Sequence, residues 1–125
     1  MDREQVTAGG LTRLAVGECL RLVPSRVQPG RLADWLTAHR THHTPAVRRQ
    51  PGFLAKLLLQ AEDDPERVAM VLLWASADAA AAWVAHPEHD VVSARVGEQA
   101  APDGAARAAA PRGGYRVLDV AAGPA

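Results

Sequence analysis

Three histidines lie close together in the segment AHRTHHT, at His39, His42 and His43. His39 and His43 are four residues apart, so both lie on one face if this segment is helical. A neutral imidazole that faces a pocket can act as a general base and take a proton from a phenol or an acidic carbon. The same spacing suits metal ligation, but no nearby Glu or Cys accompanies it, so we predict no metal. The alternative is that these side chains are half-buried or exposed and carry no chemistry.

The chain has three tryptophans, Trp35, Trp74 and Trp83, each of which offers a broad flat surface. Trp74 ends an apolar run and could stack on an aromatic substrate, although core or dimer packing would explain it equally well. Trp35 and Trp83 lie in segments expected to be helical, where they either wall a pocket or fill the core. We interpret His39, His43 and Trp74 as the catalytic candidates. The residues that we expect to contact a substrate are Trp35, His42, Met70, Leu72, Trp83 and Tyr115.

Apolar patterns and turn residues predict four strands and three helices around these side chains. Strands are expected at residues 11–27, 53–61, 68–74 and 115–120. Helices are expected at residues 31–43, 76–85 and 87–98. Pro24 favours an edge position or a bulge for the first strand, and Pro45 should end or kink the first helix. Ser76 suits the N-cap of the second helix, and HPEH, with His86 and His89, is interpreted as a helix–helix connection.

The order β-α-β-β-α-β is that of the ferredoxin-like fold, an α+β architecture with a four-stranded antiparallel sheet and helices on one face. We expect a disordered tail at residues 1–10 and one such domain at residues 11–122. The helices are expected to leave uncovered the strand face of Val68, Met70, Leu72 and Trp74. A monomer rarely exposes so apolar a surface, so we predict a homodimer in which two sheets pack face to face.

Length and composition are those of one globular domain, with 125 residues of which 48% are hydrophobic. Basic and acidic residues number 14 each, and no basic patch stands out, which argues against nucleic-acid binding. Neither a signal peptide nor an apolar run of ~20 residues is evident, so we predict a cytoplasmic protein without a membrane span. Lys56 is the only lysine, and the abundance of Arg, Ala, Gly and Pro is typical of a GC-rich bacterial genome.

Several motifs resemble those of one family. They are QPGFL at residues 50–54, DDPER at residues 63–67 and W-x-S-x-x-A-x-x-x-W-x-x-H-P-E-H from Trp74 to His89. Together they resemble the antibiotic biosynthesis monooxygenase domain of the dimeric α+β barrel superfamily. The resemblance implies a small homodimer whose sheets form a barrel, with a pocket between the sheet and the helices of each subunit. Many members oxidise aromatic polyketides with molecular oxygen and neither metal nor flavin, and Trp74 matches a Trp of that branch.

The resemblance and the residues together predict a cofactor-independent monooxygenase, or a related tailoring enzyme, that acts on an aromatic polyketide-type intermediate. Molecular oxygen would be the co-substrate. Trp74 and Trp35 would position the substrate, and His39 or His43 would move the proton. Two alternatives stay open. One is an isomerase or cyclase that uses the same histidine without oxygen, and the other is a non-catalytic dimer that binds a small ligand.

Overall fold

The computed structural model describes residues 14–101 and 115–123, so the tail predicted at residues 1–10 lies outside the described residues. The strands are β1 (Cys19–Arg26), β2 (Phe53–Ala61), β3 (Arg67–Trp74) and β4 (Tyr115–Ala122). The helical elements are α2 (Leu32–Ala38), the π-helical turn η1 (His39–His43), α3 (Thr44–Arg48), α4 (Ala77–Ala85) and α5 (Pro87–Gly97). In the described residues no helix is long and apolar enough to cross a membrane.

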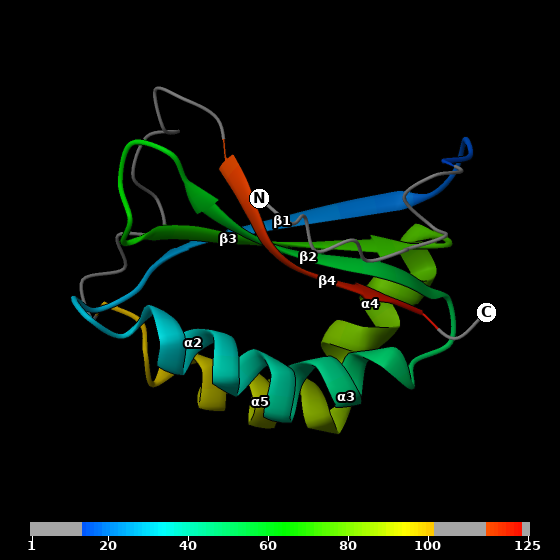
Figure 1. Ribbon diagram of the computed structural model, residues 1–125. Coiled ribbons are helices and arrows are strands. Elements are labelled where there is room, and N and C mark those ends of the chain that lie inside the picture. The colour runs from blue at the N-terminus through cyan, green and yellow to red at the C-terminus, as the bar shows by residue number, and fades with distance from the viewer. Residues whose placement is uncertain (1–13, 102–114, 124–125) are drawn as a thin grey trace.

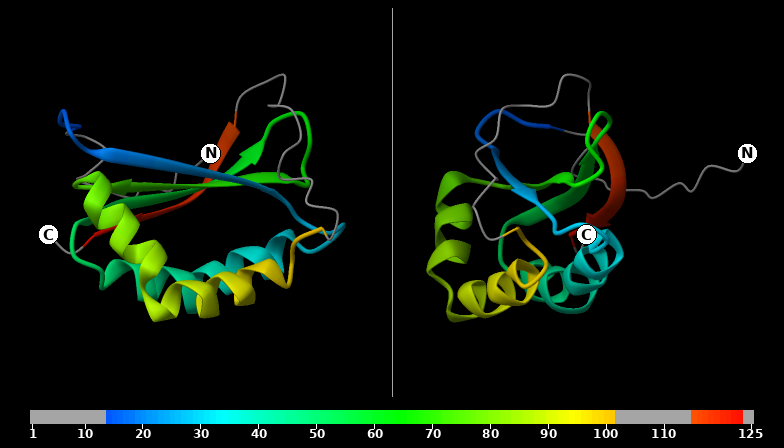
Figure 2. Two further views of the ribbon diagram at one scale, coloured as in Figure 1. Left: turned by 180° about the vertical axis from the view of Figure 1, so that it is seen from behind. Right: turned by 90° about the vertical axis from the view of Figure 1, so that its left-hand side faces the viewer.

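The four strands form one antiparallel sheet in the order β1-β3-β2-β4. The helices of the described residues lie on one face of this sheet, with α5 alongside α2, η1 and α3 (Figure 1; Figure 2, right). The ferredoxin-like α+β fold is therefore confirmed. β1 is an edge strand, as Pro24 predicts, because a proline without an N–H is tolerated where a strand has only one neighbour.

The sheet face that turns toward the helices is the one that the sequence analysis expected to be open. Val68, Leu72 and Trp74 are buried there, and the prediction that this face is uncovered is wrong. In β2 a bulge between Phe53 and Ala55 shifts the register. Beyond the bulge Lys56 pairs with Leu72, so a lysine points to the helix side where simple alternation predicts an apolar residue.

The outer face of the sheet carries three of the exposed apolar side chains. Leu20, Leu22 and Val117 are 58%, 54% and 53% exposed. They belong to the two edge strands, β1 and β4, and pair with inner-strand residues whose side chains share the outer face. The apolar surface that suggested a partner therefore exists, but on the opposite side of the sheet from the one predicted.

The elements α2, η1 and α3 form one continuous helical path, although Pro45 was expected to end or kink the first helix. A proline in an α-helix lacks an N–H and clashes with the carbonyl four residues earlier. Here the turn before Pro45 is widened, and the Thr44 amide donates to the carbonyl of His39, five residues back. This π-helical turn carries Pro45 without a break. Such turns are frequent at functional sites.

The second pair of helices begins with caps that the sequence signals. Ser76 Oγ accepts a hydrogen bond of 3.1 Å from the Ala79 amide, which confirms the predicted N-cap of α4. His86 Nδ1 accepts one of 3.1 Å from the Glu88 amide at the start of α5. His86 thus connects two helices, as interpreted from HPEH. Gly52 of the QPGFL motif packs closely against α4. A Cβ atom added at Gly52 would lie only 2.7 Å from the Cβ of Ala79, so a side chain has no room there.

Candidate functional site

A cavity of about 190 Å³ lies between the sheet and the helices at the end where β1 and α5 meet. Its wall is formed by Val23, Ser25, Trp35, His39, His43, Met70, Ser93, Val96, Gly97 and Ala100. Val23 is 47% exposed, and Gly97 on the facing helix is also exposed, so the cavity opens between β1 and α5. The imidazoles of His39 and His43 are both buried and supply its ionisable groups.

A buried lysine lies behind the two histidines. Lys56 Nζ is 2.9 Å from His39 Nδ1, 2.8 Å from His43 Nδ1 and 2.7 Å from Thr44 Oγ1. Lys56 is only 2% exposed and does not itself line the cavity. It reaches the helices from the middle of β2, and the π-helical turn brings both histidines onto it. We call Lys56, His39, His43 and Thr44 the lysine cluster.

Hydrogen-bond counting assigns the protons in the lysine cluster when Lys56 is charged. An ammonium has three N–H donors and no acceptor, and three acceptors surround Nζ. Each imidazole then accepts at Nδ1 and carries its own proton on Nε2. The Nε2 of His39 points away from Lys56 and has no hydrogen-bond partner among the described residues. His39 therefore carries an unused, buried polar atom in a ring that lines the cavity.

The electrostatics of the lysine cluster keep both imidazoles neutral at physiological pH. Burial, with the charge of Lys56 second, lowers the pKa of His39 from 6.5 to about 2. The same two causes lower the pKa of His43 to about 3. Burial lowers the pKa of Lys56 from 10.5 to about 7, opposed by the nearby carboxylate of Asp119. Lys56 is thus the group in the cluster whose charge changes near neutral pH.

The Nδ1 atoms of the two histidines are both engaged by Lys56. The two Nδ1 atoms face Lys56, so an ammonium already occupies the position between them. Among the described residues, no group of three or more His, Cys, Asp or Glu side chains is placed to hold a metal ion.

The structure gathers four of the predicted site residues around the cavity and leaves five elsewhere. His39, His43, Trp35 and Met70 line it together. Trp35 packs edge-on to His39 with ring centroids 4.5 Å apart, and His39 and His43 are 5.2 Å apart. Trp35 thus holds the ring that faces the cavity.

Trp74, a predicted catalytic residue, lies outside the cavity and within the hydrophobic core. It is 1% exposed and packs edge-on to Phe53 with ring centroids 5.7 Å apart. Leu72 and Trp83 belong to the same core cluster. The sequence left core packing open as an alternative role for Trp74. The surroundings of Trp74 support that role.

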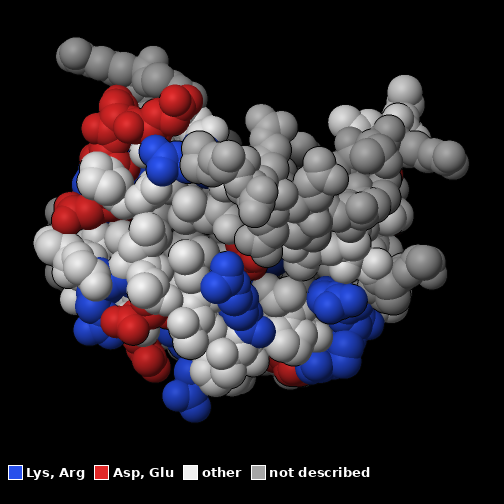
Figure 3. Space-filling model, viewed as in Figure 1, with Lys and Arg blue, Asp and Glu red and all other residues white. Residues whose placement is uncertain are grey.

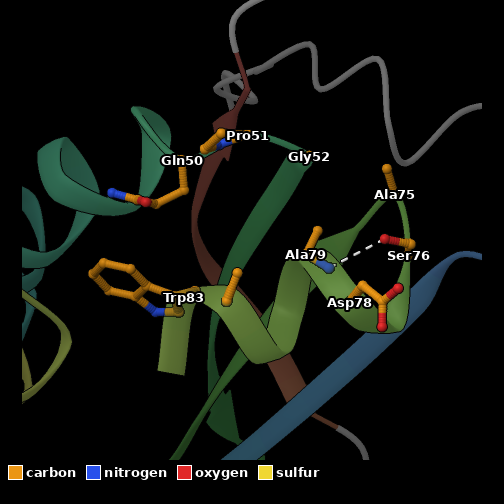
Figure 4. A pocket seen from close by; sticks show the side chains of 9 residues that line it. Gln50, Pro51, Gly52, Ala75, Ser76, Asp78, Ala79 and Trp83 are labelled. Atoms are coloured by element: carbon orange, nitrogen blue, oxygen red, sulfur yellow. Dashed lines mark hydrogen bonds between the residues drawn. The ribbon is translucent and has the colours of Figure 1, made fainter. Parts of the chain in front are cut away.

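Trp83 also borders a second and larger pocket of about 340 Å³ on the surface beside α4. Figure 4 shows its ring turned toward Gln50, with Ala75, Ser76 and Ala79 across the pocket. Among the described residues on this wall Asp78 alone is ionisable, and it is exposed. The smaller cavity is the better candidate site, because buried ionisable groups, His39 and His43, line it.

His42 and Tyr115 point to other surfaces. His42 is exposed and borders a polar depression with Arg31, Asp34 and Glu98. Tyr115 pairs with Ala61 at the end of β4, and a register shift between Leu58 and Leu59 puts it on the outer face. Acidic and basic side chains are interspersed over the helix layer in Figure 3.

Sequence reasoning missed Lys56, and one signal could have found it. A single lysine within an apolar run, here residues 53–59, has to be buried or placed at an edge. β2 is an inner strand, so Lys56 is buried and needs partners. His39 and His43 supply them.

The sheet and its helical cover define an α+β domain of the ferredoxin-like class, with a cavity between the two layers. The chain belongs to the antibiotic biosynthesis monooxygenase family, whose pattern matches residues 22–95. None of the curated proteins matches the chain.

Three solved structures share the fold at low sequence identity. A Bordetella bronchiseptica protein, named a "putative antibiotic biosynthesis monooxygenase", has a TM-score of 0.62 and 21% identity over 82% of this chain and 93% of its own. A Nitrosomonas europaea protein of the same name has a TM-score of 0.58 and 19% identity over 89% and 94%. A conserved protein from Methanosarcina mazei Go1 has a TM-score of 0.58 and 8% identity over 86% and 93%. At these identities the likeness concerns the fold.

Proposed function

We propose that this protein is a cofactor-independent monooxygenase that oxidises an aromatic polyketide-type intermediate held in the cavity beside His39. The observation that supports it most is a buried, neutral imidazole whose Nε2 has no partner among the described residues and which lines an apolar cavity. Family membership supports the reaction class, and Trp35 and Met70 supply surfaces on which a flat ring can pack.

The reaction needs a proton to leave the substrate before oxygen can react. Loss of a proton from an activated methylene or phenol leaves an electron-rich anion that can transfer electrons to molecular oxygen. One oxygen atom then replaces the two methylene hydrogens as a carbonyl, and the other leaves with those hydrogens as water. The task of the protein is to move that proton and stabilise the anion, and His39 is placed to do both.

The size of the cavity limits how much of a substrate it can enclose. Its volume of about 190 Å³ lies below the roughly 300–1,000 Å³ typical of pockets for drug-sized ligands. We therefore expect the reacting ring to be enclosed, while the remainder of a polycyclic substrate extends through the opening beside Val23.

Oxygen consumption tests the proposal directly. Metal-free protein is mixed with a panel of anthrone-type and naphthol-type substrates while dissolved oxygen and product are followed. We expect oxygen uptake that is stoichiometric with quinone formation for at least one scaffold. No uptake and no product with any scaffold, from folded protein, would refute the oxygenase assignment.

An isomerase or cyclase is the second candidate, because proton transfer through His39 does not itself require oxygen. The same panel incubated under nitrogen separates the two. Product that forms at an equal rate without oxygen would favour the isomerase or cyclase.

We further propose that the protein is a homodimer joined through the outer face of the sheet. The support is the exposed apolar trio Leu20, Leu22 and Val117, which two copies could bury against each other. Light scattering on the wild type should give twice the mass of one chain, and Leu22→Glu should give the monomer mass with an unchanged circular dichroism spectrum. A wild-type mass of one chain would contradict the dimer.

A further inference from the structure

The lysine cluster must rearrange its hydrogens when Lys56 loses its charge. A neutral amine has two N–H donors and one lone pair, but the same three groups still surround Nζ. One of the three must therefore become a donor to the lone pair of Lys56. An imidazole can do so if its proton moves from Nε2 to Nδ1, which leaves a lone pair on Nε2.

We propose that Lys56 is the proton acceptor of this site and that His39 passes the proton to it by changing tautomer. In the step, the bond from the substrate to hydrogen breaks and a bond from that hydrogen to His39 Nε2 forms. At the same time the Nδ1–H bond of His39 breaks and a third N–H bond forms on Lys56. The products are a substrate anion, a neutral His39 that donates from Nε2, and an ammonium behind it.

The geometry selects His39 from the three neighbours of Lys56. His39 lines the cavity, is 1% exposed and keeps Nε2 without a partner among the described residues, so a substrate hydroxyl can pair with it. The Trp35 ring packs against His39 and keeps the imidazole in place. Thr44 is the competing donor, because its hydroxyl could also turn toward a neutral amine. The relay through His39 and donation by Thr44 predict different tautomers.

The charges around Lys56 allow both of its states near neutral pH. His39 and His43 face it from η1, and Asp119 acts on it from β4. Asp119 is itself 3.5 Å from Arg40, and His89 on α5 acts on His43. Burial lowers the pKa of Lys56 to about 7 while Asp119 raises it. Below that pH Lys56 is charged, and Nε2 of His39 carries a proton that it can only donate in a hydrogen bond toward the cavity. Above that pH Lys56 is neutral, and Nε2 has a lone pair that can accept a proton.

Nuclear magnetic resonance of the ligand-free protein tests the relay without any substrate. Because Lys56 is the only lysine, lysine labelled with ¹³C and ¹⁵N at the ε-carbon and ζ-nitrogen gives a single titrating side chain. Histidine labelled with ¹⁵N reports which ring nitrogen carries the proton. We expect the protonated nitrogen of His39 to change from Nε2 to Nδ1 as pH rises, with the midpoint of the Lys56 titration near pH 7. A His39 tautomer that stays constant while Lys56 titrates would overturn the relay.

Thr44→Val gives an independent test with a variant of nearly the same shape. In the relay Thr44 accepts from Lys56 in both states, and its bond to the ammonium is the stronger. Its removal should lower both midpoints together, by roughly half to one pH unit. If Thr44 instead donates to the neutral amine, His39 keeps its proton on Nε2 at every pH, so no His39 midpoint moves with that of Lys56, and the relay fails.

The relay deepens the proposed function and depends on it only for the molecule that supplies the proton. A tautomer change at the Lys56 midpoint without oxygen uptake would refute the oxygenase and leave the relay standing. Oxygen uptake with a constant His39 tautomer would support the oxygenase and refute the relay.

Discussion

The two ends of the layer between sheet and helices are built from similar residues for different purposes. At one end Trp74, Phe53, Leu72 and Trp83 fill the interior with apolar side chains. At the other end Trp35 and Met70 leave a cavity, and a lysine with two histidines lies behind it. The difference teaches that a buried ionisable group beside a cavity is a better indicator of a candidate site than a buried tryptophan.

The two ends also contribute differently to stability. Apolar burial at the Trp74 end stabilises the fold by about 25 cal/mol per Å² removed from water. Burial of Lys56 at the cavity end costs free energy, because its charge loses water and is compensated in part by hydrogen bonds and by the carboxylate of Asp119. We infer that apolar packing at the Trp74 end stabilises the fold, and that the buried lysine at the cavity end makes the candidate site reactive.

The largest effect that tests this comparison is expected from His39→Gln. Glutamine keeps a polar group near Lys56 but cannot exchange a proton, so turnover should fall by about 10²–10⁴. The thermal midpoint should change little by comparison with Trp74→Ala. The matched control is His42→Gln, three residues along and exposed. An equal loss of turnover in both variants would contradict the assignment of the site to His39.

Trp74→Ala should have the opposite profile. Removing a fully buried tryptophan from the filled end is expected to lower the free energy of unfolding by about 3–5 kcal/mol. Denaturant titration measures this loss, and turnover per folded molecule at low temperature should be retained. The more conservative Trp74→Phe should show a smaller loss of stability. If Trp74→Phe stays fully stable yet loses turnover, Trp74 acts in the reaction after all.

Acid should destabilise the protein through the cavity end. The pKa values of His39 and His43 are lowered from 6.5 to about 2 and about 3 in the folded protein. Between these values and pH 6.5 the unfolded chain therefore binds protons at both histidines, whereas the folded protein does not. Their contribution to stability is therefore complete above pH 6.5 and is lost as the pH falls toward 3. The expected slope is about 1.4 kcal/mol per pH unit for each histidine. Denaturant titrations at pH 7, 6 and 5 measure it, and His39→Gln should remove about half of it.

The smallest effect is expected at the start of α4, which supports the filled end. Ser76→Ala removes the hydroxyl that accepts from the Ala79 amide, at a cost of about 1 kcal/mol. Ser76→Asp keeps an acceptor at the same position and should restore the stability. Thermal melts of the two variants measure the difference, and turnover should follow the wild type in both.

Much of the fold could be predicted from the sequence because its signals are local. Alternation in strands, the Ser76 cap and the order of the elements all depend on neighbours within a few residues. The helix side of the sheet could not be predicted, because β3 is apolar on both faces and alternation does not choose between them. The face of Lys56 could not be predicted either, because a bulge after Phe53 reverses it, although a lone lysine in an apolar strand already indicates burial.

The sequence by itself determined the α+β element order, the helical spacing of His39 and His43 and the edge position signalled by Pro24. Each follows from short-range geometry that a few residues specify. Only the tertiary structure decided that β4 pairs with β2, that Trp74 is core and that Lys56 meets both histidines. These contacts join residues far apart in the chain, and a one-residue change of register in β2 is enough to make or lose them.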